Sequence, residues 1–342
     1  MDQENKVKTE EVVSEEKTEA VEIERKESEN TLSKEVAIEK PDSNAMDYGE
    51  VIEKARLDFI KSYKVSRRNS YIAMGVVFLF AVASVIFITL NQVAFKIVGW
   101  SLVGAAVLGM LIYYIVTRNS LPNKTKEYIA VVNENLNKQN FSNSLITEAR
   151  TDKAEKMDLA DVLTDSLYKN LNNIASRNVV NGRYDGRTFK VADVGLYSGV
   201  GRNRLAVFVG KYVAMPNDVH FEGRYIINIR GEKPVDLPTD TDDLVELVNK
   251  DDLIIYGKDG NKPASDLGKE FINSVKEIRL NKTLLNFNLV IWGGHSSAYL
   301  SYEDSIMTLP FDKPFDRDAN EVFHKNLVDV LEMFNLLTKK EK

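Results

Sequence analysis

Two long apolar runs dominate the pattern of hydrophobic and polar positions, at residues 71–90 and 97–116. Each run is 20 residues long and contains no Asp, Glu, Lys or Arg. At roughly 1.5 Å per residue, a helix of this length reaches about 30 Å, which is the thickness of a hydrocarbon core. A buried helix of a soluble protein is normally amphipathic, whereas these runs are apolar on every side. The pattern therefore predicts two membrane-spanning helices.

The segment between the runs, residues 91–96, has room only for a tight turn, which predicts a transmembrane helical hairpin over residues 70–117. Lys96 is the only basic residue in the turn, and the other basic residues flank the hairpin on the side of the two termini. Because basic flanks stay in the cytoplasm, we expect a multi-pass protein of the cell membrane with both termini cytoplasmic. The same side chains would lie near anionic lipid headgroups. These flanking residues are Lys61, Lys64, Arg67, Arg68, Arg118, Lys124 and Lys126.

Small residues recur every four positions in the second run, at Ser101, Ala105 and Gly109. Such a face lets another helix approach closely, and we expect it to pack against the first run of the same chain. Self-association of two copies through this face is the alternative. Because the runs hold no ionisable group of the kind that ion and proton paths use, the hairpin alone is a poor candidate for a conducting path.

The regions on either side of the hairpin differ in charge and pattern. Residues 1–45 carry fourteen acidic and seven basic residues, a balance of −7, so the other residues sum to −6 − (−7) = +1. This segment lacks aromatic residues and a sustained period, which predicts a disordered acidic tail, with docking of a partner as the functional alternative. Residues 46–69 place Ile52, Ala55, Phe59 and Tyr63 on one stripe, which predicts a juxtamembrane helix. We expect residues 118–153 to be a helical connector, with a helix over 123–137.

The remaining residues, 154–342, are expected to form a cytosolic α+β domain. Apolar positions spaced three and four apart predict a helix over 154–175, and further helices are expected over 242–249, 265–279 and 320–338. Between them the period changes to two, with a hairpin turn at Asp185–Gly186 and several strands. The clearest alternation predicts an antiparallel sheet with one buried face. It places Leu285, Phe287, Leu289 and Ile291 on one side of a strand and Asn286 and Asn288 on the other.

Composition narrows the chemistry without naming a reaction. The absence of cysteine excludes disulfides, thiolate metal sites and cysteine nucleophiles. The near-neutral charge outside the tail gives no nucleic-acid-binding footprint. The first residues, "MDQENKVKTEEVV", are charged, and we therefore expect no cleavable signal peptide.

Three short motifs resemble functional sites. "GVGRNR", residues 199–204, lacks the Lys-Ser/Thr of a phosphate loop and lies between two predicted strands, so we expect a turn. In "GGHSS" the Gly-Gly pair predicts a hairpin tip that exposes His295, and adjacent residues cannot form a catalytic triad. "DRDANE" fails as a calcium loop, because Glu321 and Leu327 stand at the positions of its Gly and Glu, and we expect Asn320 or Asp318 to cap a helix.

The three histidines, His220, His295 and His324, lack the spacing of a metal motif. We therefore assign no catalytic residue, no metal and no cofactor, although an enzyme that uses only Asp, Glu and Tyr is not excluded.

The sequence also resembles a bacterial membrane-protein family, domain of unknown function 3137, over roughly residues 47–338. The segments that carry the resemblance are "VNGRYDGRTFKVADVGLY", "FVGKYV", "LVELVNKDDLIIYGKDG", "LLNFNLVIWGGHSSAYLSY" and "NLVDVLEMFNLLTK". The resemblance implies a helix, two close spans and a cytosolic mixed domain, and it supplies no catalytic residues.

The expected function is a membrane anchor that presents a cytosolic domain to a protein partner or to another copy of itself. One alternative is a membrane-tethered enzyme with a carboxylate- or tyrosine-based site, which would require a pocket with clustered polar side chains. Another is an accessory subunit of a membrane transport assembly, in which a partner supplies the polar lining.

Overall fold

A computed structural model describes residues 36–38, 47–90, 92–118, 120–151, 155–199, 204–229, 244–250, 252–280, 282–302 and 311–337. The chain divides into two compact units. One contains the apolar hairpin and the helices around it, and the other contains the sheet. Almost all of the predicted acidic tail, and "GVGRNR" apart from its first and last residues, lie outside the described residues.

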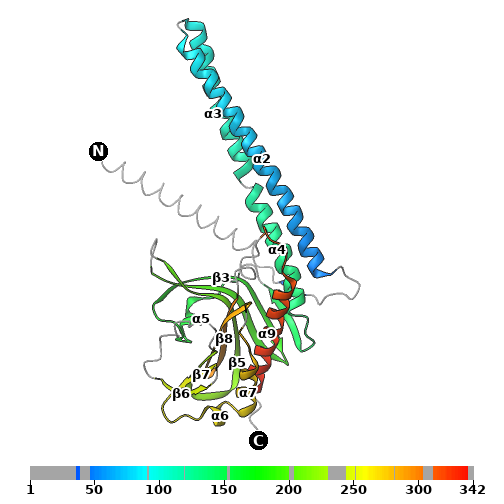
Figure 1. Ribbon diagram of the computed structural model, residues 1–342, viewed down its shortest axis with the longest axis vertical. Coiled ribbons are helices and arrows are strands. Elements are labelled where there is room, and N and C mark those ends of the chain that lie inside the picture. The colour runs from blue at the N-terminus through cyan, green and yellow to red at the C-terminus, as the bar shows by residue number, and fades with distance from the viewer. Residues whose placement is uncertain are drawn as a thin grey trace, which may run out of the picture. The chain divides into compact units, whose positions relative to one another are not determined.

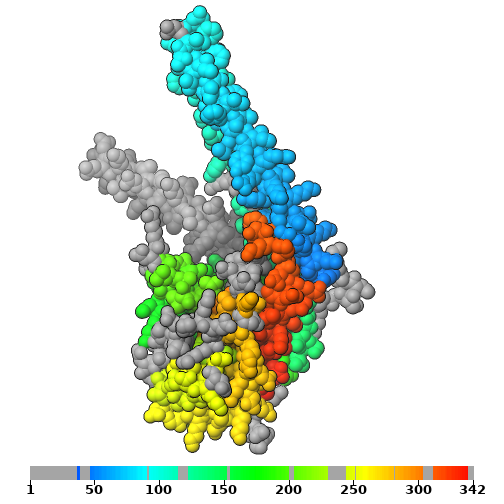
Figure 2. All heavy atoms as spheres, in the orientation of Figure 1, coloured from blue at the N-terminus to red at the C-terminus, as the bar shows by residue number. Residues whose placement is uncertain are grey.

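The hairpin consists of α2 (Tyr48–Thr89) and α3 (Val93–Arg118), which run antiparallel beside each other (Figure 1). Both helices are long and apolar enough to cross a membrane. In each, only 6% of the most apolar window is buried inside the structure, which distinguishes them from the core helices of a soluble protein. The blue and cyan side chains of these helices form one continuous rod in Figure 2. The predicted juxtamembrane helix is the first part of α2, since the helix continues without interruption through 42 residues.

The two helices of the hairpin approach each other closely at Gly99. A Cβ added to this residue would lie 2.6 Å from Ile88 Cγ1 and 3.0 Å from the Ser84 carbonyl oxygen. The glycine is therefore required because α2 occupies the space that a side chain would need. Ser84 is buried at this contact and satisfies its hydroxyl by donating to the Phe80 carbonyl at 2.6 Å.

The small-residue face predicted to pack on the first span lies elsewhere. Ser101, Ala105 and Gly109 are all exposed, and a Cβ on Gly109 would meet nothing within 4 Å. The expected packing of this face against α2 is wrong, because the helix rotation that brings Gly99 onto α2 turns these three residues away. The alternative, self-association through this face, stays a prediction.

An aromatic cluster joins the first part of α2 to α4 (Ser120–Asn140). The Phe59 and Tyr128 rings stack with centroids 5.1 Å apart, and Ile52 and Val132 are buried beside them. This confirms the predicted apolar stripe on α2.

Among the described residues, the second unit is built on an eight-stranded sheet in which every pairing is antiparallel. Its path runs β1-β2-β3-β4-β5-β7-β6, and β8 pairs with β5. The strands are β1 (Val36–Ala37), β2 (Ile146–Thr151), β3 (Leu171–Tyr184), β4 (Arg187–Ser198), β5 (Leu205–Ile229), β6 (Val245–Lys250), β7 (Leu253–Gly257) and β8 (Leu284–Tyr302). The α+β prediction is confirmed. So is the turn at Asp185–Gly186, where both residues have positive φ, of 50° and 82°.

The long strands β5 and β8 organise the sheet. Along one edge of β5, its first part pairs with β4 and its last part pairs with β7. Along the other edge, β8 pairs with β5 from Lys211 to Ile229. The β5–β8 register shifts between Pro216 and Phe221 and again between Phe221 and Tyr225. Such irregularities bend a strand and re-aim its side chains. They place a bend in the middle of both strands.

Both faces of the sheet are covered in this region. Phe287, Leu289 and Ile291 are buried as predicted, but Leu285 is 46% exposed, and Asn286 and Asn288 on the other face are buried too. The expectation of one buried face is therefore wrong for β8. The Asn288 side-chain oxygen Oδ1 accepts from Asn228 Nδ2 at 2.6 Å, which offsets the cost of burying the amide.

The helices of this unit are short apart from the last one. They are α5 (Leu159–Leu163), α6 (Pro263–Asp266), α7 (Lys269–Glu277) and α9 (Arg317–Leu336). Helix α9 agrees with the prediction for 320–338. The predicted helix over 265–279 is divided, because Gly268 has φ of 90° and ends α6 before α7 begins.

Three sequence predictions of secondary structure are corrected. The helix expected over 154–175 ends at Leu163, and residues from Leu171 form β3. Leu167 and Leu171 are buried as core residues, so their helical spacing arose from a turn followed by a strand. The connector over 118–153 is helical only to Asn140, since β2 follows within it. The helix expected over 242–249 is wrong for residues 245–249, which belong to β6, and residues 242–243 lie outside the described residues.

Candidate functional site

A buried carboxylate lies at the centre of a polar cluster in the sheet unit. Asp165 follows α5 in a tight turn, in which its amide donates to the Val162 carbonyl at 3.2 Å. Its side chain has no exposed surface. An isolated carboxylate in such a position would be very costly, so its hydrogen-bond partners decide whether it is tolerated.

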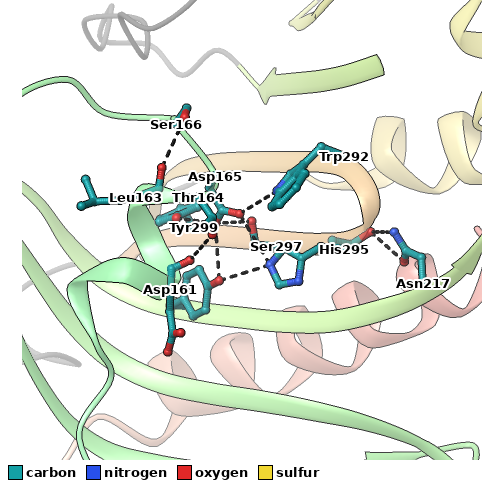
Figure 3. Close-up of polar contacts among 12 residues, drawn as sticks. Asp161, Leu163, Thr164, Asp165, Ser166, Asn217, Trp292, His295, Ser297 and Tyr299 are labelled. Carbon is teal, nitrogen blue, oxygen red and sulfur yellow. Dashed lines mark hydrogen bonds and ion pairs between the residues drawn. The ribbon is translucent and has the colours of Figure 1, made fainter. Parts of the chain in front are cut away.

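Strand β8 supplies most of these partners, and their side chains converge on the carboxylate (Figure 3). The Ser297 hydroxyl donates to Asp165 Oδ2 at 2.7 Å and the Tyr299 hydroxyl donates to the same oxygen at 2.6 Å. Trp292 Nε1 donates to Oδ1 at 3.2 Å. Alternate residues of a strand face the same side, which is why His295, Ser297 and Tyr299 all point at Asp165.

Tyr212 on β5 completes the cluster. It is the register partner of Tyr299, and the two rings meet edge to face with centroids 5.1 Å apart. Its hydroxyl lies 3.4 Å from Asp165 Oδ2. Burial, and after it the charge of Asp165, raise the pKa of both Tyr212 and Tyr299 well above the ordinary value for tyrosine. Both phenols therefore stay neutral at physiological pH and act as hydrogen-bond donors to the carboxylate.

His295 stands at the bend in β5 and β8. It pairs with Pro216 at the last position before the register shift, and Gly293 has a positive φ of 50° two residues earlier. Its Nε2 lies 3.5 Å from Asp165 Oδ1 and 3.5 Å from the Tyr212 hydroxyl, while its side chain remains 30% exposed. The neighbouring Ser296 faces the other way and exchanges hydrogen bonds with Asn217 at 2.7 and 2.9 Å. His295 is thus held by its strand neighbours and reaches solvent at one edge.

A cavity of about 670 Å³ opens beside this cluster, entirely within the sheet unit. Its floor is formed by strands β3, β4 and β5, and its walls by α5 and by the bend in β8. Pockets that bind small molecules commonly have volumes of about 300–1,000 Å³. The lining residues are Ala160, Asp161, Thr164, Asn181, Gly182, Thr188, Phe189, Lys190, Tyr212, Ala214, Met215, Pro216, Trp292 and His295.

The charged residues at the rim of the cavity are paired with each other. Lys190 Nζ lies 3.2 Å from Glu155 Oε1 and 3.9 Å from Asp161 Oδ2. Asn181 Nδ2 donates to the other oxygen of Glu155 at 2.5 Å. The rim therefore holds one lysine between two carboxylates, and each of these charges has a partner within the protein.

This arrangement is suited to binding more than to carboxylate chemistry. Asp165 is shielded from the cavity by its own donors, and among the described residues Tyr212, Trp292 and His295 bring the polar cluster to the cavity wall. Among the residues that the structure describes, no three His, Cys, Asp or Glu side chains are grouped so that they could hold a metal ion.

The sequence prediction for "GGHSS" requires correction. Residues 293–294 do not form a hairpin tip, because β8 continues through them, and His295 lies against the buried cluster. Sequence reasoning also missed Asp165, which was taken for a residue within a helix. A usable signal was present: His295, Ser297 and Tyr299 alternate at strand spacing, and three polar-tipped side chains on one strand face indicate a shared partner.

The other candidate residues lie apart from this cluster. Asp316, not Asn320 or Asp318, caps α9, since its carboxylate accepts from the Ala319 amide at 2.9 Å. His324 Nδ1 bonds to the Asn140 carbonyl oxygen at 2.8 Å, and His220 is exposed on β5.

The basic residues that flank the hairpin are solvent-exposed where their side chains are described. They are Lys61, Lys64, Arg67 and Arg68 on α2, and Lys124 and Lys126 on α4. The side chain of Arg118 lies outside the described part.

Comparisons with known proteins leave the family open. No family model and no curated protein matches the chain. Among solved structures, the mycobacterial trehalose monomycolate transport factor A is similar over 50% of this chain and 79% of its own, with 10% identity and a TM-score of 0.30. A TM-score this low does not establish a shared fold. The resemblance to domain of unknown function 3137 therefore stays a prediction.

Proposed function

We propose that the protein is a membrane-anchored binding protein. The α2–α3 hairpin would fix it in the bilayer, and the α+β unit would bind a protein partner or a second copy at the cytoplasmic membrane surface. The observation that carries the proposal is the hairpin surface. Its apolar side chains are exposed all around two helices, an arrangement that is stable in lipid and unfavourable in water.

The proposed orientation rests on the basic flanks. The exposed Lys and Arg side chains at the ends of the hairpin that lead to the two termini favour a cytoplasmic position for both termini. Their attraction to anionic headgroups would contribute about 1 kcal/mol for each residue near the surface.

Because the chain has no cysteine, single cysteines can test this orientation directly. We expect Gln92→Cys, between the two helices, to react with a membrane-impermeant thiol reagent in intact cells. Lys282→Cys, an exposed residue of the sheet unit, should react only after permeabilisation. Labelling of Lys282→Cys in intact cells, or recovery of the chain in the soluble fraction without detergent, would contradict the proposal.

Partner binding is tested with the full chain in detergent. Cross-linking in the native membrane followed by purification should recover a defined partner or a defined oligomer. A second two-span protein of similar abundance serves as the control for nonspecific capture. A chain that remains monomeric and recovers nothing beyond this control would overturn the binding proposal. If a polytopic transport protein is recovered, the accessory-subunit alternative is favoured, because such a partner would supply the polar lining that the hairpin lacks.

Binding is favoured over the carboxylate- or tyrosine-based enzyme by the chemistry of the cluster. A catalytic carboxylate must reach its substrate, and Asp165 is fully buried beneath Ser297 and Tyr299. A catalytic tyrosine usually ionises during reaction, whereas burial raises the pKa of Tyr212. The cluster is better suited to holding His295 in place as a recognition residue.

A further inference from the structure

We infer that the cavity beside α5 binds a small uncharged amphiphile, with its hydroxyl head against His295 and its apolar chain against the sheet. The inference rests on the proposed binding function and deepens it by naming a ligand class and a site within the α+β unit.

The apolar part of the ligand is indicated by the floor and walls. Phe189, Ala214 and Met215 line the sheet side of the cavity, and Trp292 and Pro216 line the bend. Trp292 is held in place by its hydrogen bond to Asp165, so its indole forms a fixed wall. An apolar chain in this cavity would displace water from side chains that cannot hydrogen-bond to it.

The absence of charge on the ligand follows from the pairing of the charges around the cavity. Lys190 is already paired with Glu155 and Asp161, and the Asp165 carboxylate is buried and already accepts from neutral donors, so these charges are engaged within the protein. A carboxylate or ammonium head would lose its hydration without gaining an unpaired partner among the described lining residues, which is unfavourable.

The position of the head is set by His295. Its Nε2 is directed to Asp165 and Tyr212, and a proton on Nε2 is stabilised by the carboxylate. Nδ1 then carries a lone pair. Within the described part of the chain it has no hydrogen-bond partner, so it is available to accept from a hydroxyl at the cavity wall. Ligands with a hydroxyl should therefore bind more tightly than those without one.

The chain contains its own reporter for this site. It has two tryptophans, Trp100 in α3 and Trp292 at the cavity, so Trp100→Phe leaves Trp292 as the only fluorophore of its kind. Bromine quenches an indole that it contacts. The experiment titrates 6-bromohexanol into the full-length Trp100→Phe protein in dodecyl maltoside, and compares it with 6-bromohexanoate and 6-bromohexyl-trimethylammonium, which have the same chain and a charged head.

We expect saturable quenching by 6-bromohexanol, reversed by dilution, with at least about tenfold weaker binding of the two charged probes, the factor expected for roughly 1.4 kcal/mol. His295→Ala should weaken 6-bromohexanol about tenfold, as expected for the loss of one hydrogen bond. The matched control, His220→Ala, removes an exposed histidine outside the lining and should leave the titration unchanged.

A second pair of variants tests the cavity without touching the polar cluster. Ala160→Phe places a ring at the exposed mouth on α5 and should abolish saturable quenching, whereas Ala206→Phe, exposed on β5 outside the lining, should not. Near-ultraviolet circular dichroism confirms that each variant is folded.

Equal binding of all three probes, unsaturable quenching, or an Ala160→Phe protein that still binds would overturn this inference. The topology and partner experiments above would be unaffected by such a result, so failure of the ligand site is distinguishable from failure of the proposed function.

Discussion

The hairpin and the sheet unit satisfy their polar groups in opposite ways. In the hairpin, Ser84, Thr89 and Ser101 each donate to a carbonyl three or four residues earlier in the same helix. In the sheet unit, Asp165 is held by Trp292 and Tyr299, which lie 127 and 134 positions away in the chain. A helix in lipid must be self-sufficient, because the surroundings offer no hydrogen bonds. A buried cluster in a folded sheet unit can be assembled from distant strands, so it depends on the whole fold.

The largest effect on stability should come from removing Asp165, the acceptor at the centre of the cluster in the sheet unit. Asp165→Ala leaves the Ser297, Tyr299 and Trp292 donors buried without their acceptor, and we expect a loss of about 3–5 kcal/mol in the free energy of unfolding of the sheet unit. Urea unfolding followed by Trp292 fluorescence in the Trp100→Phe background measures it. The control Asp161→Ala, on the same turn of chain but exposed, should cost less than about 1 kcal/mol. Equal effects of the two would mean that Asp165 does not organise the cluster.

A change at the hairpin contact should be smaller and confined to the hairpin. Gly99→Ile forces a side chain into the space held by Ile88 and Ser84, at a cost of about 1–3 kcal/mol. Spin labels at Phe78→Cys and Val107→Cys, both exposed positions, should report a broader inter-helix distance distribution. Gly109→Ile, which meets open space, should leave the distribution unchanged. Broadening by Gly109→Ile alone would instead support packing through the small-residue face.

Alkaline pH should destabilise the sheet unit selectively. The pKa of Tyr212 and of Tyr299 is raised in the folded state, so the unfolded chain loses their protons first. The contribution of these tyrosines to the free energy of unfolding is therefore fully present below about pH 10, the ordinary tyrosine pKa. Above that pH the free energy of unfolding falls by about 1.4 kcal/mol per pH unit for each buried tyrosine. The free energy of unfolding measured between pH 9 and 11 should show this slope. Tyr299→Phe should reduce the slope by the contribution of one buried tyrosine, about 1.4 kcal/mol per pH unit. A slope that Tyr299→Phe leaves unchanged would contradict the assignment.

The smallest effect concerns a helix end that the structure and the sequence assign differently. Asp316→Ala removes the acceptor for the Ala319 amide at the start of α9 and should cost about 1 kcal/mol. Asn320→Ala should cost less, because the buried amide nitrogen of Asn320 has no hydrogen-bond partner in the described structure. Thermal unfolding of the two variants ranks them, and the reverse order would restore Asn320 as the cap.

The local sequence pattern was enough to predict those helices and turns that are determined by interactions between residues near in sequence. The hairpin, the unbroken juxtamembrane helix, the Asp185–Gly186 turn and α9 all follow from runs, periods or turn residues within about twenty positions. Where apolar spacing was ambiguous, tertiary packing decided the outcome. Leu167 and Leu171 have helical spacing, yet both reach the core from a turn and a strand.

Local reasoning could have found the alternation of His295, Ser297 and Tyr299, but not the partner that they share. Neither Asp165 nor His295 is distinctive among its sequence neighbours, and their significance arises only when β8 lies across the turn after α5. The Gly-Gly pair before His295 suggested a chain reversal, whereas the bend in β5 and β8 uses Gly293 at a positive φ within a continuous strand.

The continuity of α2 has a mechanical consequence. At about 1.5 Å per residue, its 42 residues form a rigid lever of roughly 63 Å that begins beside the aromatic cluster and ends inside the apolar hairpin. A thinner bilayer would force such a lever to tilt. Because no hinge interrupts the helix, the tilt would be transmitted to Ile52 and Phe59, and through them to the stacked ring of Tyr128.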